Sequence, residues 1–244
     1  MKGVILAGGS GSRLHPLTAV TNKHLLPVYN KPLIYFPIEK LVEAGVTDIL
    51  IVTSGEYMSH FTSLLDNGSG LGARLRYAVQ LAPNGLADAL RLAKDFAQGE
   101  KIIMVLGDNV FEDSLKEPVQ AFQKMKGAAI FLKEHPEARD YGVVEMKDGK
   151  VIDIEEKPVA PKSNWCAVGI YMYNPDVFDV IDTLKPSKRG EYEITDVNRV
   201  YLERGELSYF KLKGEWFDCG NFYWLLKANL FVAKKYHNFD SGNA

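Results

Sequence analysis

The sequence predicts an α/β protein with a three-layer, Rossmann-like architecture and a mixed, mostly parallel sheet. In the first half, short apolar runs alternate with amphipathic segments, which is typical of parallel strands joined by helices. The first apolar run ends at Leu6 and leads directly into a glycine-rich turn. A chain of 244 residues is long enough for one sizeable domain, so we expect a single domain over 1–244.

The N-terminal half, about 1–126, is expected to hold strands at 3–7, 48–53 and 101–106 and helices at 33–44 and 86–97. Pro32 can open the first helix and Gly45 can close it. Pro37 lies inside that helix, where we expect a kink or a lost backbone hydrogen bond. Asn84-Gly85 forms a turn before the next helix.

The second half, about 127–236, is expected to use antiparallel pairing. Asp148-Gly149 separates strand-like segments at 142–147 and 150–155, which is a strong hairpin signal. Asn174-Pro175 is typical of a helix cap and first turn. Further helices are expected at 192–204, ending at Gly205, and at 221–236, before a polar tail.

The glycine-rich turn is the first candidate binding site. Residues 6–13 read LAGGSGSR, so backbone N–H groups can converge on phosphate oxygens without obstruction by Cβ atoms. The guanidinium of Arg13 adds positive charge and a bidentate donor. No Asp or Glu occurs before Glu39, which makes this segment locally cationic. The pattern predicts a polyphosphate ligand.

Composition and motif spacing exclude several function classes. The turn lacks the third glycine and the later acidic residue of a dinucleotide site, and no Gly-Lys-Ser/Thr completes a Walker A loop. The net charge of −2 gives no general attraction to nucleic acid or anionic membranes. No apolar run approaches the roughly 18 residues that cross a bilayer. The start of the sequence lacks a signal-peptide pattern. The two cysteines, Cys166 and Cys219, form neither a metal-ligand spacing nor a disulfide framework. We expect a cytoplasmic protein without nucleic acid or membrane partners.

Together with later segments, the turn resembles the signature of the sugar-1-phosphate nucleotidylyltransferases. The matching segments, in chain order, are LAGGSGSR at 6–13, KHLLP at 23–27, KP at 31–32, Gln80 with PNGLA at 83–87, LGDN at 106–109, YGVV at 141–144, EEKP at 155–158, RGE at 189–191 with EITD at 193–196, and WFDCG at 216–220. They extend over nearly the whole chain. The resemblance implies the nucleotide-diphospho-sugar transferase fold.

The resemblance also implies where the nucleotide binds. The residues implied to contact it are Leu6, Gly8, Gly9, Ser10, Gly11, Ser12, Arg13, Gln80, Gly85 and Asp108. Gln80 can read a pyrimidine edge because its amide both donates and accepts hydrogen bonds, and Gly85 would let the base lie close to the backbone. Arg13, Lys23 and Asp108 are implied to be catalytic.

Metal and sugar sites follow from the same resemblance. Asp108 and Asp218 would supply oxygen ligands to one Mg²⁺ that bridges the phosphates. The implied sugar-phosphate site consists of Lys23, Gly142, Glu156, Lys157 and Arg189. Glu156 would accept hydrogen bonds from sugar hydroxyls, while Lys157 and Arg189 would pair with the phosphate.

The implied reaction joins dTTP and glucose 1-phosphate to give dTDP-glucose and pyrophosphate, in a homo-oligomer that is a dimer or a tetramer. A UTP-dependent uridylyltransferase is the alternative. Thymine differs from uracil by one methyl group, and an apolar pocket gains only about 1 to 3 kcal/mol of discrimination between two ligands from such a group. A non-catalytic nucleotide-sugar-binding subunit is disfavoured since Arg13, Lys23 and Asp108 are all present. His24 and the segment 165–168 depart from the family pattern and leave the sugar selectivity open.

Overall fold

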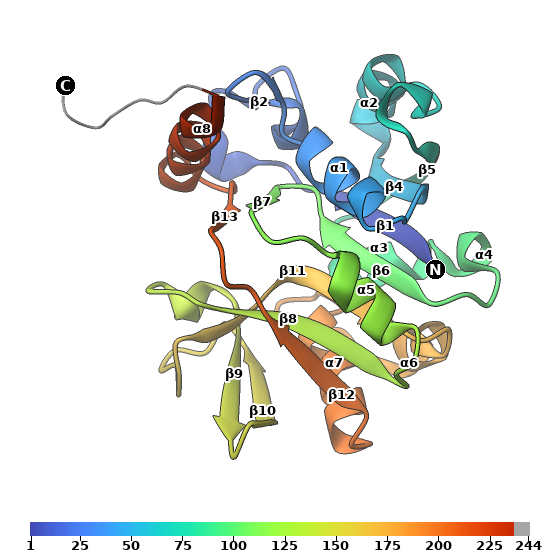
Figure 1. Ribbon diagram of the computed structural model, residues 1–244, viewed down its shortest axis with the longest axis vertical. Helices are drawn as coiled ribbons and strands as arrows, with labels where there is room; N and C mark the ends of the chain where they lie inside the picture. Colours follow the sequence, from blue (N-terminus) through green and yellow to red (C-terminus); the bar gives the residue numbers. More distant parts are fainter. Residues whose placement is uncertain (237–244) are drawn as a thin grey trace.

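The computed structural model describes residues 1–236, and within them a nine-stranded mixed sheet forms the centre of the molecule (Figure 1). Its N-terminal part is parallel, in the order β5-β4-β1-β6. These strands are β1 (Lys2–Ala7), β4 (Asp48–Ser54), β5 (Arg74–Gln80) and β6 (Ile102–Leu106). Since parallel strands end at the same sheet edge, the loops that follow β1, β5 and β6 are brought together.

The second part of the sheet is largely antiparallel. Strand β11 (Trp165–Tyr173) pairs with β6 and also with β8 (Ala128–Glu134) and β9 (Gly142–Lys147). β10 (Lys150–Glu156) forms a hairpin with β9, and β12 (Leu207–Lys211) lies parallel to β8. The β9–β10 hairpin extends away from the parallel strands in Figure 1.

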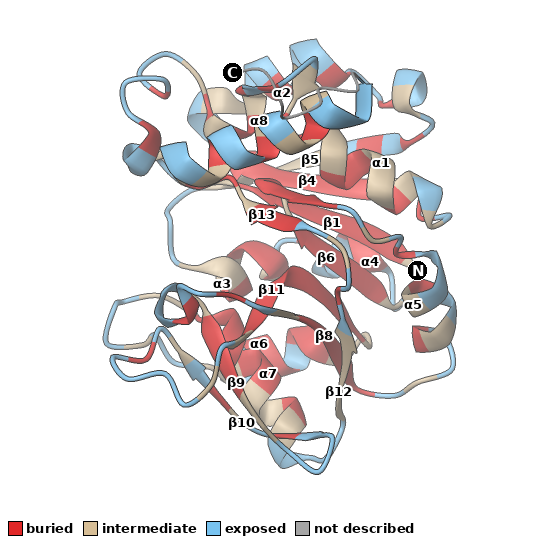
Figure 2. Ribbon diagram, turned by 60° about the vertical axis from the view of Figure 1, so that its left-hand side comes forward, coloured by how far each residue is buried: buried red, intermediate tan, exposed pale blue. Residues whose placement is uncertain are grey.

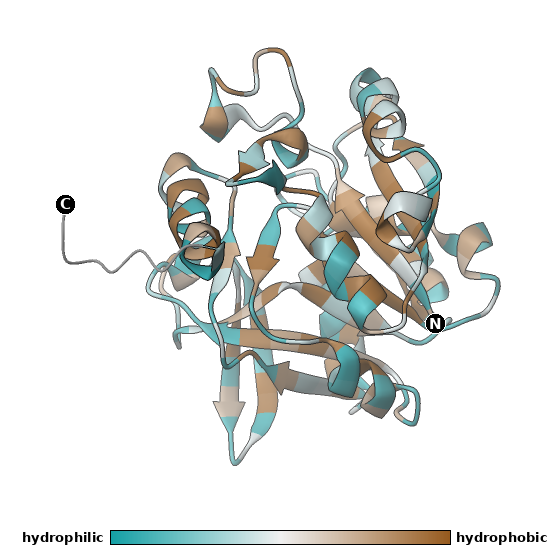
Figure 3. Cartoon of the chain, turned by 45° about the horizontal axis from the view of Figure 1, so that its top comes forward, coloured by the Kyte–Doolittle hydropathy of each residue, from teal (hydrophilic) through white to brown (hydrophobic). Residues whose placement is uncertain are grey.

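Helices cover both faces of the sheet, which gives three layers. On β1, Val4 and Leu6 belong to the apolar cluster on one face, while Ile5 and Ala7 belong to the cluster on the other. The first face is covered by α3 (Leu86–Arg91), α4 (Lys94–Ala97), α6 (Val177–Thr183) and α7 (Ile194–Glu203), and the second by α1 (Tyr35–Glu43), α2 (Met58–Leu65) and α5 (Lys116–Phe122). Buried residues follow the central strands in Figure 2, and the same strands are strongly hydrophobic in Figure 3.

Two small sheets complete the edge where the loops gather. β7 (Asn109–Phe111) pairs with β13 (Trp216–Asp218), and β2 (Pro27–Val28) pairs with β3 (Lys31–Pro32). Short 3₁₀ turns lie at η1 (Ser12–Leu14), η2 (Lys23–Leu25), η3 (Gly55–Tyr57), η4 (Ser69–Leu71) and η5 (Ala138–Asp140). The last helix, α8 (Phe222–Tyr236), packs Leu225, Ala228 and Val232 into a third apolar cluster. No helix within 1–236 has the length and apolar character needed to cross a membrane.

The predicted fold class is confirmed, and most predicted elements are present within a few residues of their expected bounds. The hairpin turn has positive φ at both Asp148 and Gly149, as a type I′ turn requires. The polar tail lies outside the described residues.

Three local predictions are wrong. Pro32 belongs to β3 rather than to a helix start. Pro37 falls in the first turn of α1, where backbone N–H groups have no intrahelical partner, so it costs no hydrogen bond. Asn174 does not cap a helix, because α6 starts only at Val177 and the side-chain oxygen of Asn174 is buried without a hydrogen bond.

One predicted helix is divided. The segment expected as a single helix over 86–97 forms α3 and α4, which are separated by a turn at 92–93.

Candidate active site

The first cavity lies where β1, β5 and β6 end, and it has a volume of about 220 Å³. Of the residues expected at a nucleotide, it is lined by Leu6, Gly8, Gly9, Gln80, Gly85 and Asp108. Ser10 lines an adjoining hollow together with Gly8, Gly9 and Gln80. Gly11 and Ser12 line neither cavity, since the chain turns into η1 at this point. The glycine-rich turn therefore contributes its first half to the cavity wall.

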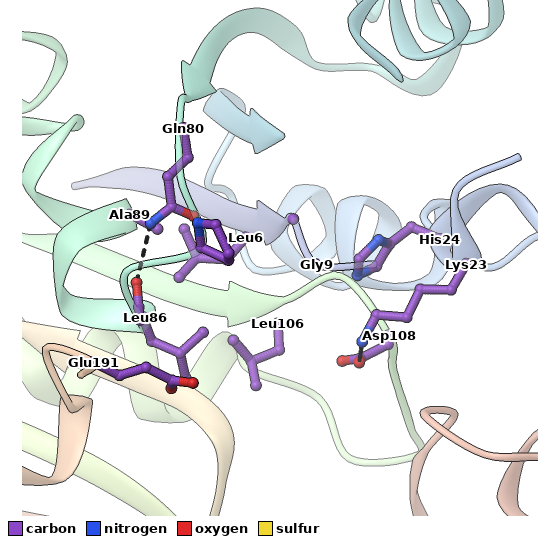
Figure 4. A pocket seen from close by; sticks show the side chains of 13 residues that line it. Leu6, Gly9, Lys23, His24, Gln80, Leu86, Ala89, Leu106, Asp108 and Glu191 are labelled. Carbon is purple, nitrogen blue, oxygen red and sulfur yellow. Dashed lines mark hydrogen bonds and ion pairs between the residues drawn. The ribbon is translucent and has the colours of Figure 1, made fainter. Parts of the chain in front are cut away.

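Lys23 and Asp108 form an ion pair and hydrogen bond at one side of this cavity (Figure 4). Their side chains are only 16% and 9% exposed, respectively, so water screens the pair weakly. Burial alone would raise the pKa of Asp108, but the Lys23 ammonium holds that pKa well below its ordinary value. Burial likewise opposes the charge on Lys23, yet Asp108 and Asp218 raise its pKa. Both groups are therefore charged at neutral pH.

Asp218 is brought to Asp108 by the β7–β13 pairing, in which Asp218 lies opposite Asn109. The Cys219 N–H donates to the Asp108 carbonyl oxygen over 2.9 Å and fixes this approach. Burial and the negative charge of Asp108 raise the pKa of Asp218 to about 6. The two neighbouring carboxylates thus have an excess of negative charge that Lys23 only partly offsets.

This donor set fits a small hard cation. Within 1–236, no group of three or more His, Cys, Asp or Glu side chains could hold a metal ion. Mg²⁺ is commonly held by one or two carboxylates, with waters and substrate phosphates as its other ligands. Asp108 and Asp218 therefore suit an ion that completes its coordination with the substrate.

Gln80 lies at the opposite side of the same cavity (Figure 4). Its amide nitrogen donates to the carbonyl oxygen of Gly85 over 3.2 Å and to the carboxylate of Asp88 over 3.0 Å. Both partners can only accept hydrogen bonds, so the orientation of the amide is determined. The Gln80 Oε1 atom is thereby left as a hydrogen-bond acceptor.

Gly85 lines the first cavity and also has a structural role. Its φ is +104°, a value that favours glycine. The turn is joined to the other half of the domain, because Tyr192 N–H donates to the Asn84 carbonyl over 2.7 Å and Ala87 N–H donates to the Tyr192 carbonyl over 3.1 Å. Close approach to this second chain segment requires glycine here, since a Cβ atom would lie 2.5 Å from the Tyr192 carbonyl oxygen.

A second, larger cavity of about 490 Å³ lies against β9, β10 and β11. Gly142, Glu156 and Lys157 line it, as expected for the sugar site. Thr195 Oγ1 donates a hydrogen bond to Glu156, and a Cβ atom at Gly142 would lie 3.0 Å from that hydroxyl. Burial raises the pKa of Glu156 despite this bond. Glycine at 142 therefore makes room for the Glu156–Thr195 pair.

Lys157 has a left-handed backbone with φ of +44°, which is uncommon for a residue with a side chain. Its N–H donates to the Tyr141 carbonyl oxygen over 3.0 Å, which holds the residue at the end of β10. Such local strain is often found at functional sites.

Arg13 and Arg189, the two arginines expected at the site, do not line the cavities at which they were expected. Arg13 lines the second cavity rather than the first, and a Cβ atom at Gly220 would be 2.8 Å from its guanidinium. Arg189 lines neither cavity and forms ion pairs with Glu156, Glu191 and Glu193 at 3.6, 3.1 and 3.5 Å. Arg13 therefore lies with Asp218 at the second cavity, and Arg189 is enclosed by carboxylates beside that cavity.

The two cavities are contiguous, because Leu86 and Leu106 line both. Asp108 lines the first and Asp218 the second. The paired carboxylates and Lys23 therefore lie at the junction. Two ligands bound in these cavities would meet beside the carboxylates.

Several residues of the site were missed by sequence reasoning. Asn109 accepts from the Trp216 indole N–H over 2.7 Å and donates to Asp108 over 3.0 Å, so it orients the Asp108 carboxylate. His24 lines the first cavity and its Nδ1 contacts Asn22 Oδ1 at 2.5 Å. The other lining residues that were given no role are Pro83, Leu86, Ala89, Leu106, Glu137, Asp140, Tyr141, Ala167, Gly169, Tyr171, Glu191, Glu193, Ile194, Trp216 and Asn221. Asn109, Trp216 and many of the others lie within the segments that match the family signature, which was the sequence signal available for them. His24 also stands directly after Lys23.

Comparison with known proteins supports a single family. The model of the nucleotidyl transferase family matches residues 2–235. A glucose-1-phosphate thymidylyltransferase of Mycolicibacterium smegmatis is 46% identical over 236 residues, which cover 95% of this chain and 82% of that protein. The enzyme of the same name from Neisseria meningitidis is 43% identical over 238 residues, with 95% and 82% coverage.

Solved structures agree with these relatives. A putative glucose-1-phosphate thymidylyltransferase from Bacillus anthracis, crystallised with a sucrose, superposes with a TM-score of 0.92 at 45% identity, covering 95% of each chain. A UDP-glucose pyrophosphorylase bound to UDP-glucose superposes with a TM-score of 0.86 at 26% identity, covering 96% of this chain and 98% of that one.

Proposed function

The chain belongs to the nucleotidyl transferase family, and from this premise we propose that it transfers a thymidylyl group from dTTP to glucose 1-phosphate. The products are dTDP-glucose and pyrophosphate. The observation that best supports this proposal is the junction of two cavities at Asp108 and Asp218. A nucleotide in the first cavity and a sugar phosphate in the second would meet there.

The first cavity suits the nucleotide. Gly8, Gly9 and Ser10 directly follow the buried strand β1, so their backbone N–H groups can bind phosphate oxygens without obstruction. Gln80 lies at the far side, where its acceptor oxygen suits the ring N–H of thymine. Leu6, Gly85 and Asp108 line the space between, while Gly11, Ser12 and Arg13 would act from the margin of the turn.

Nucleotidyl transfer proceeds by in-line attack of a sugar-phosphate oxygen on the α-phosphorus of the triphosphate. The new P–O bond forms as the bond to the pyrophosphate oxygen breaks, and both electrons of the broken bond leave with pyrophosphate. No proton needs to be removed, because the phosphate nucleophile is already ionised. Catalysis therefore depends on alignment and on offsetting negative charge.

Lys23 is the residue best placed to offset that charge. Its ammonium is held at the junction by Asp108 and stays protonated because Asp108 and Asp218 raise its pKa. Arg13 adds a second cation beside Asp218, on the side of the sugar cavity. Together these groups would favour the crowded phosphates of the transition state.

We propose Mg²⁺ as the metal, with Asp108 and Asp218 as its protein ligands. When bound, the ion supplies charge neutralisation and polarises phosphate oxygens. Burial and the like charge of Asp108 raise the pKa of Asp218 to about 6, and a bound cation would relieve the like-charge part of that rise.

The second cavity suits glucose 1-phosphate. Glu156 can accept hydrogen bonds from sugar hydroxyls, while Lys157 can pair with the sugar phosphate. Gly142 leaves room for the Glu156–Thr195 pair that orients the carboxylate. Arg189 would act through Glu156, with which it pairs at 3.6 Å.

UTP remains the second candidate donor. The acceptor oxygen of Gln80 suits uracil as well as thymine, because both bases have a ring N–H at the same position. The overall similarity to a UDP-glucose pyrophosphorylase also favours this alternative.

The test is pyrophosphate release with glucose 1-phosphate and Mg²⁺, with dTTP, UTP, CTP, ATP and GTP offered separately. The highest kcat/KM with dTTP supports the proposal, whereas a lead of UTP favours the alternative. Chelation with EDTA should abolish release. Release that persists in EDTA would contradict the metal assignment.

We further propose a homo-oligomer, a dimer or tetramer, in the cytoplasm. Large apolar side chains on α8 are about half exposed, namely Phe222, Tyr223, Leu226 and Leu230, which suits a contact between two copies. The two cysteines are free and buried, which suits a reducing compartment. Light scattering of the wild type and of Leu226→Lys tests the oligomer, which the substitution should dissociate.

A further inference from the structure

We propose that Asp88 is a positioning residue that selects the base by fixing which end of the Gln80 amide faces the nucleotide cavity. The proposal rests on the function proposed above, in which the cavity beside Gln80 holds the base. Asp88 is the third residue of α3 and contacts Gln80 rather than the cavity itself. Its role would therefore be exerted through Gln80.

In both side-chain hydrogen bonds of Gln80, the amide nitrogen is the donor. The amide nitrogen donates to Asp88 Oδ2 over 3.0 Å and to the Gly85 carbonyl over 3.2 Å. A flipped amide would place its oxygen against these two acceptors and would lose both bonds. Within 1–236, Gln80 Oε1 has no hydrogen-bond donor, and it lies 3.6 Å from the position of a Cβ atom on Gly8, which lines the cavity. Gln80 Oε1 can therefore accept a hydrogen bond from a ligand in the cavity.

Arg91 holds the carboxylate of Asp88 in place. Its Nη1 donates to Asp88 Oδ1 over 3.3 Å, while its Nη2 donates to the Ile181 carbonyl over 3.2 Å. The guanidinium also lies 3.4 Å from Asp182 and stacks over the Tyr192 ring at 5.0 Å. An ionised carboxylate is only a hydrogen-bond acceptor, so Asp88 accepts from Gln80 and cannot donate to it.

A hydrogen-bond acceptor at this position distinguishes the pyrimidine bases by whether ring atom N3 carries a hydrogen. Thymine and uracil have a ring N–H at N3, which can donate to Gln80 Oε1. Cytosine has a lone pair at the same nitrogen, so it would place an acceptor against an acceptor. A buried polar group without a partner is strongly unfavourable, and discrimination of this kind can be large. Asp88 would therefore favour thymine and uracil over cytosine.

The test compares kcat/KM for dTTP and dCTP in Asp88→Asn, Asp88→Ala and the wild type. Asparagine at 88 can donate to a flipped Gln80, so the dTTP-over-dCTP ratio should fall by at least about tenfold. Alanine removes one acceptor but offers no donor, and Gly85 still holds the amide, so this ratio should fall less. A uniform loss of both activities, with the ratio unchanged, would overturn the proposal.

Two controls distinguish an effect on base selection from a general loss of activity. Asp182→Asn removes the other carboxylate at Arg91 without contacting Gln80, and it should leave the ratio unchanged. In a Gln80→Ala background, Asp88→Asn should have no further effect on the ratio, as a double-mutant cycle requires. A further fall in that background would show that Asp88 acts by another route and would overturn the proposal.

Failure of the proposed function is distinguishable. It would appear in the wild type as an absence of turnover with glucose 1-phosphate. The affinities of dTTP and dCTP, measured by calorimetry for the wild type and Asp88→Asn, would then decide the proposal by the same ratio. An unchanged affinity ratio would contradict it.

Discussion

A Cβ atom at Gly85 would lie only 2.5 Å from the carbonyl oxygen of Tyr192, so the nucleotide loop and the segment beside the sugar cavity are in direct backbone contact. Two backbone hydrogen bonds join the same segments. Glu191, next to Tyr192, lines the nucleotide cavity as a result. The two halves of the site are therefore held in register by this contact.

Gly85→Ala should weaken both subsites. The new side chain must displace the Tyr192 backbone, and the φ of +104° adds strain. We expect kcat/KM to fall by at least about tenfold for both substrates, since misplacement of reacting groups by about 1 Å can cost that much or more. Gly99→Ala is a matched control, because Gly99 also has positive φ, at +75°, but no atom lies within 4 Å of its Cβ position. An equal loss of activity in both variants would contradict this explanation.

Asp108→Asn should remove most turnover while the fold is retained. Asparagine has nearly the same shape and keeps an oxygen that Asn109 Nδ2 can reach, but it lacks the charge that pairs with Lys23 and would bind a cation. We expect kcat to fall by about 10² to 10³. Asp179→Asn, at an exposed helical site, serves as the control and should retain full activity. Near-normal turnover of Asp108→Asn would rule out its role as a metal ligand.

Lys157→Ala should act mainly on the sugar phosphate. The KM for glucose 1-phosphate should rise by about tenfold or more, as expected for loss of a charged hydrogen bond, while the KM for dTTP changes little. Lys162→Ala is the control, since Lys162 is exposed and pairs with Glu145 and Asp153 away from the cavity. A larger effect on dTTP would mean that the two subsites have been assigned in reverse.

The free energy of unfolding should fall on acidification, because His24 stays neutral in the folded protein while the same histidine in the unfolded chain binds a proton. Burial, with a smaller contribution from the Lys23 charge, lowers the pKa of His24 to about 3, whereas an unfolded histidine has a pKa near 6.5. Between these values the unfolded chain binds the proton more tightly, so the free energy of unfolding rises with pH across this window. The contribution is full above about pH 6.5 and is lost as the pH falls towards 3, with a total of roughly a few kcal/mol.

Urea unfolding at pH 7 and pH 5 measures this effect. His24→Gln cannot be protonated, and its amide can still donate to Asn22 Oδ1 as the His24 ring does. Other groups titrate in the same range, so the informative quantity is the difference in pH dependence between the two proteins. The variant should lose less stability on acidification. Identical pH dependence would show that His24 does not stay neutral in the folded protein.

The elements that a local pattern determines were predicted well. β1 and β6 are apolar runs that end in polar loops, and the Asp148-Gly149 hairpin has the backbone geometry that its residues favour. Both strands end at the same sheet edge, where Gly8, Gly9 and Asp108 line one cavity. The physical reason is that parallel strands end together.

Long-range contacts were not predictable in the same way. Asp218 reaches Asp108 through two strands of three residues each, which are too short to give a periodic signal. The role of Gly85 depends on Tyr192, more than a hundred positions later in the chain. The resemblance to known enzymes indicated which residues matter, but it did not indicate how Asp88, Asn109 or Trp216 orient them.

The most direct test of nucleotidyl transfer follows the phosphorus atoms of the donor. The purified protein would be incubated with glucose 1-phosphate, Mg²⁺ and dTTP labelled at either the α- or the γ-phosphorus. The account predicts that the α-label appears in dTDP-glucose and the γ-label in pyrophosphate, with neither product formed by Asp108→Asn above trace levels. Release of the γ-label as inorganic phosphate, without a labelled sugar nucleotide, would contradict it.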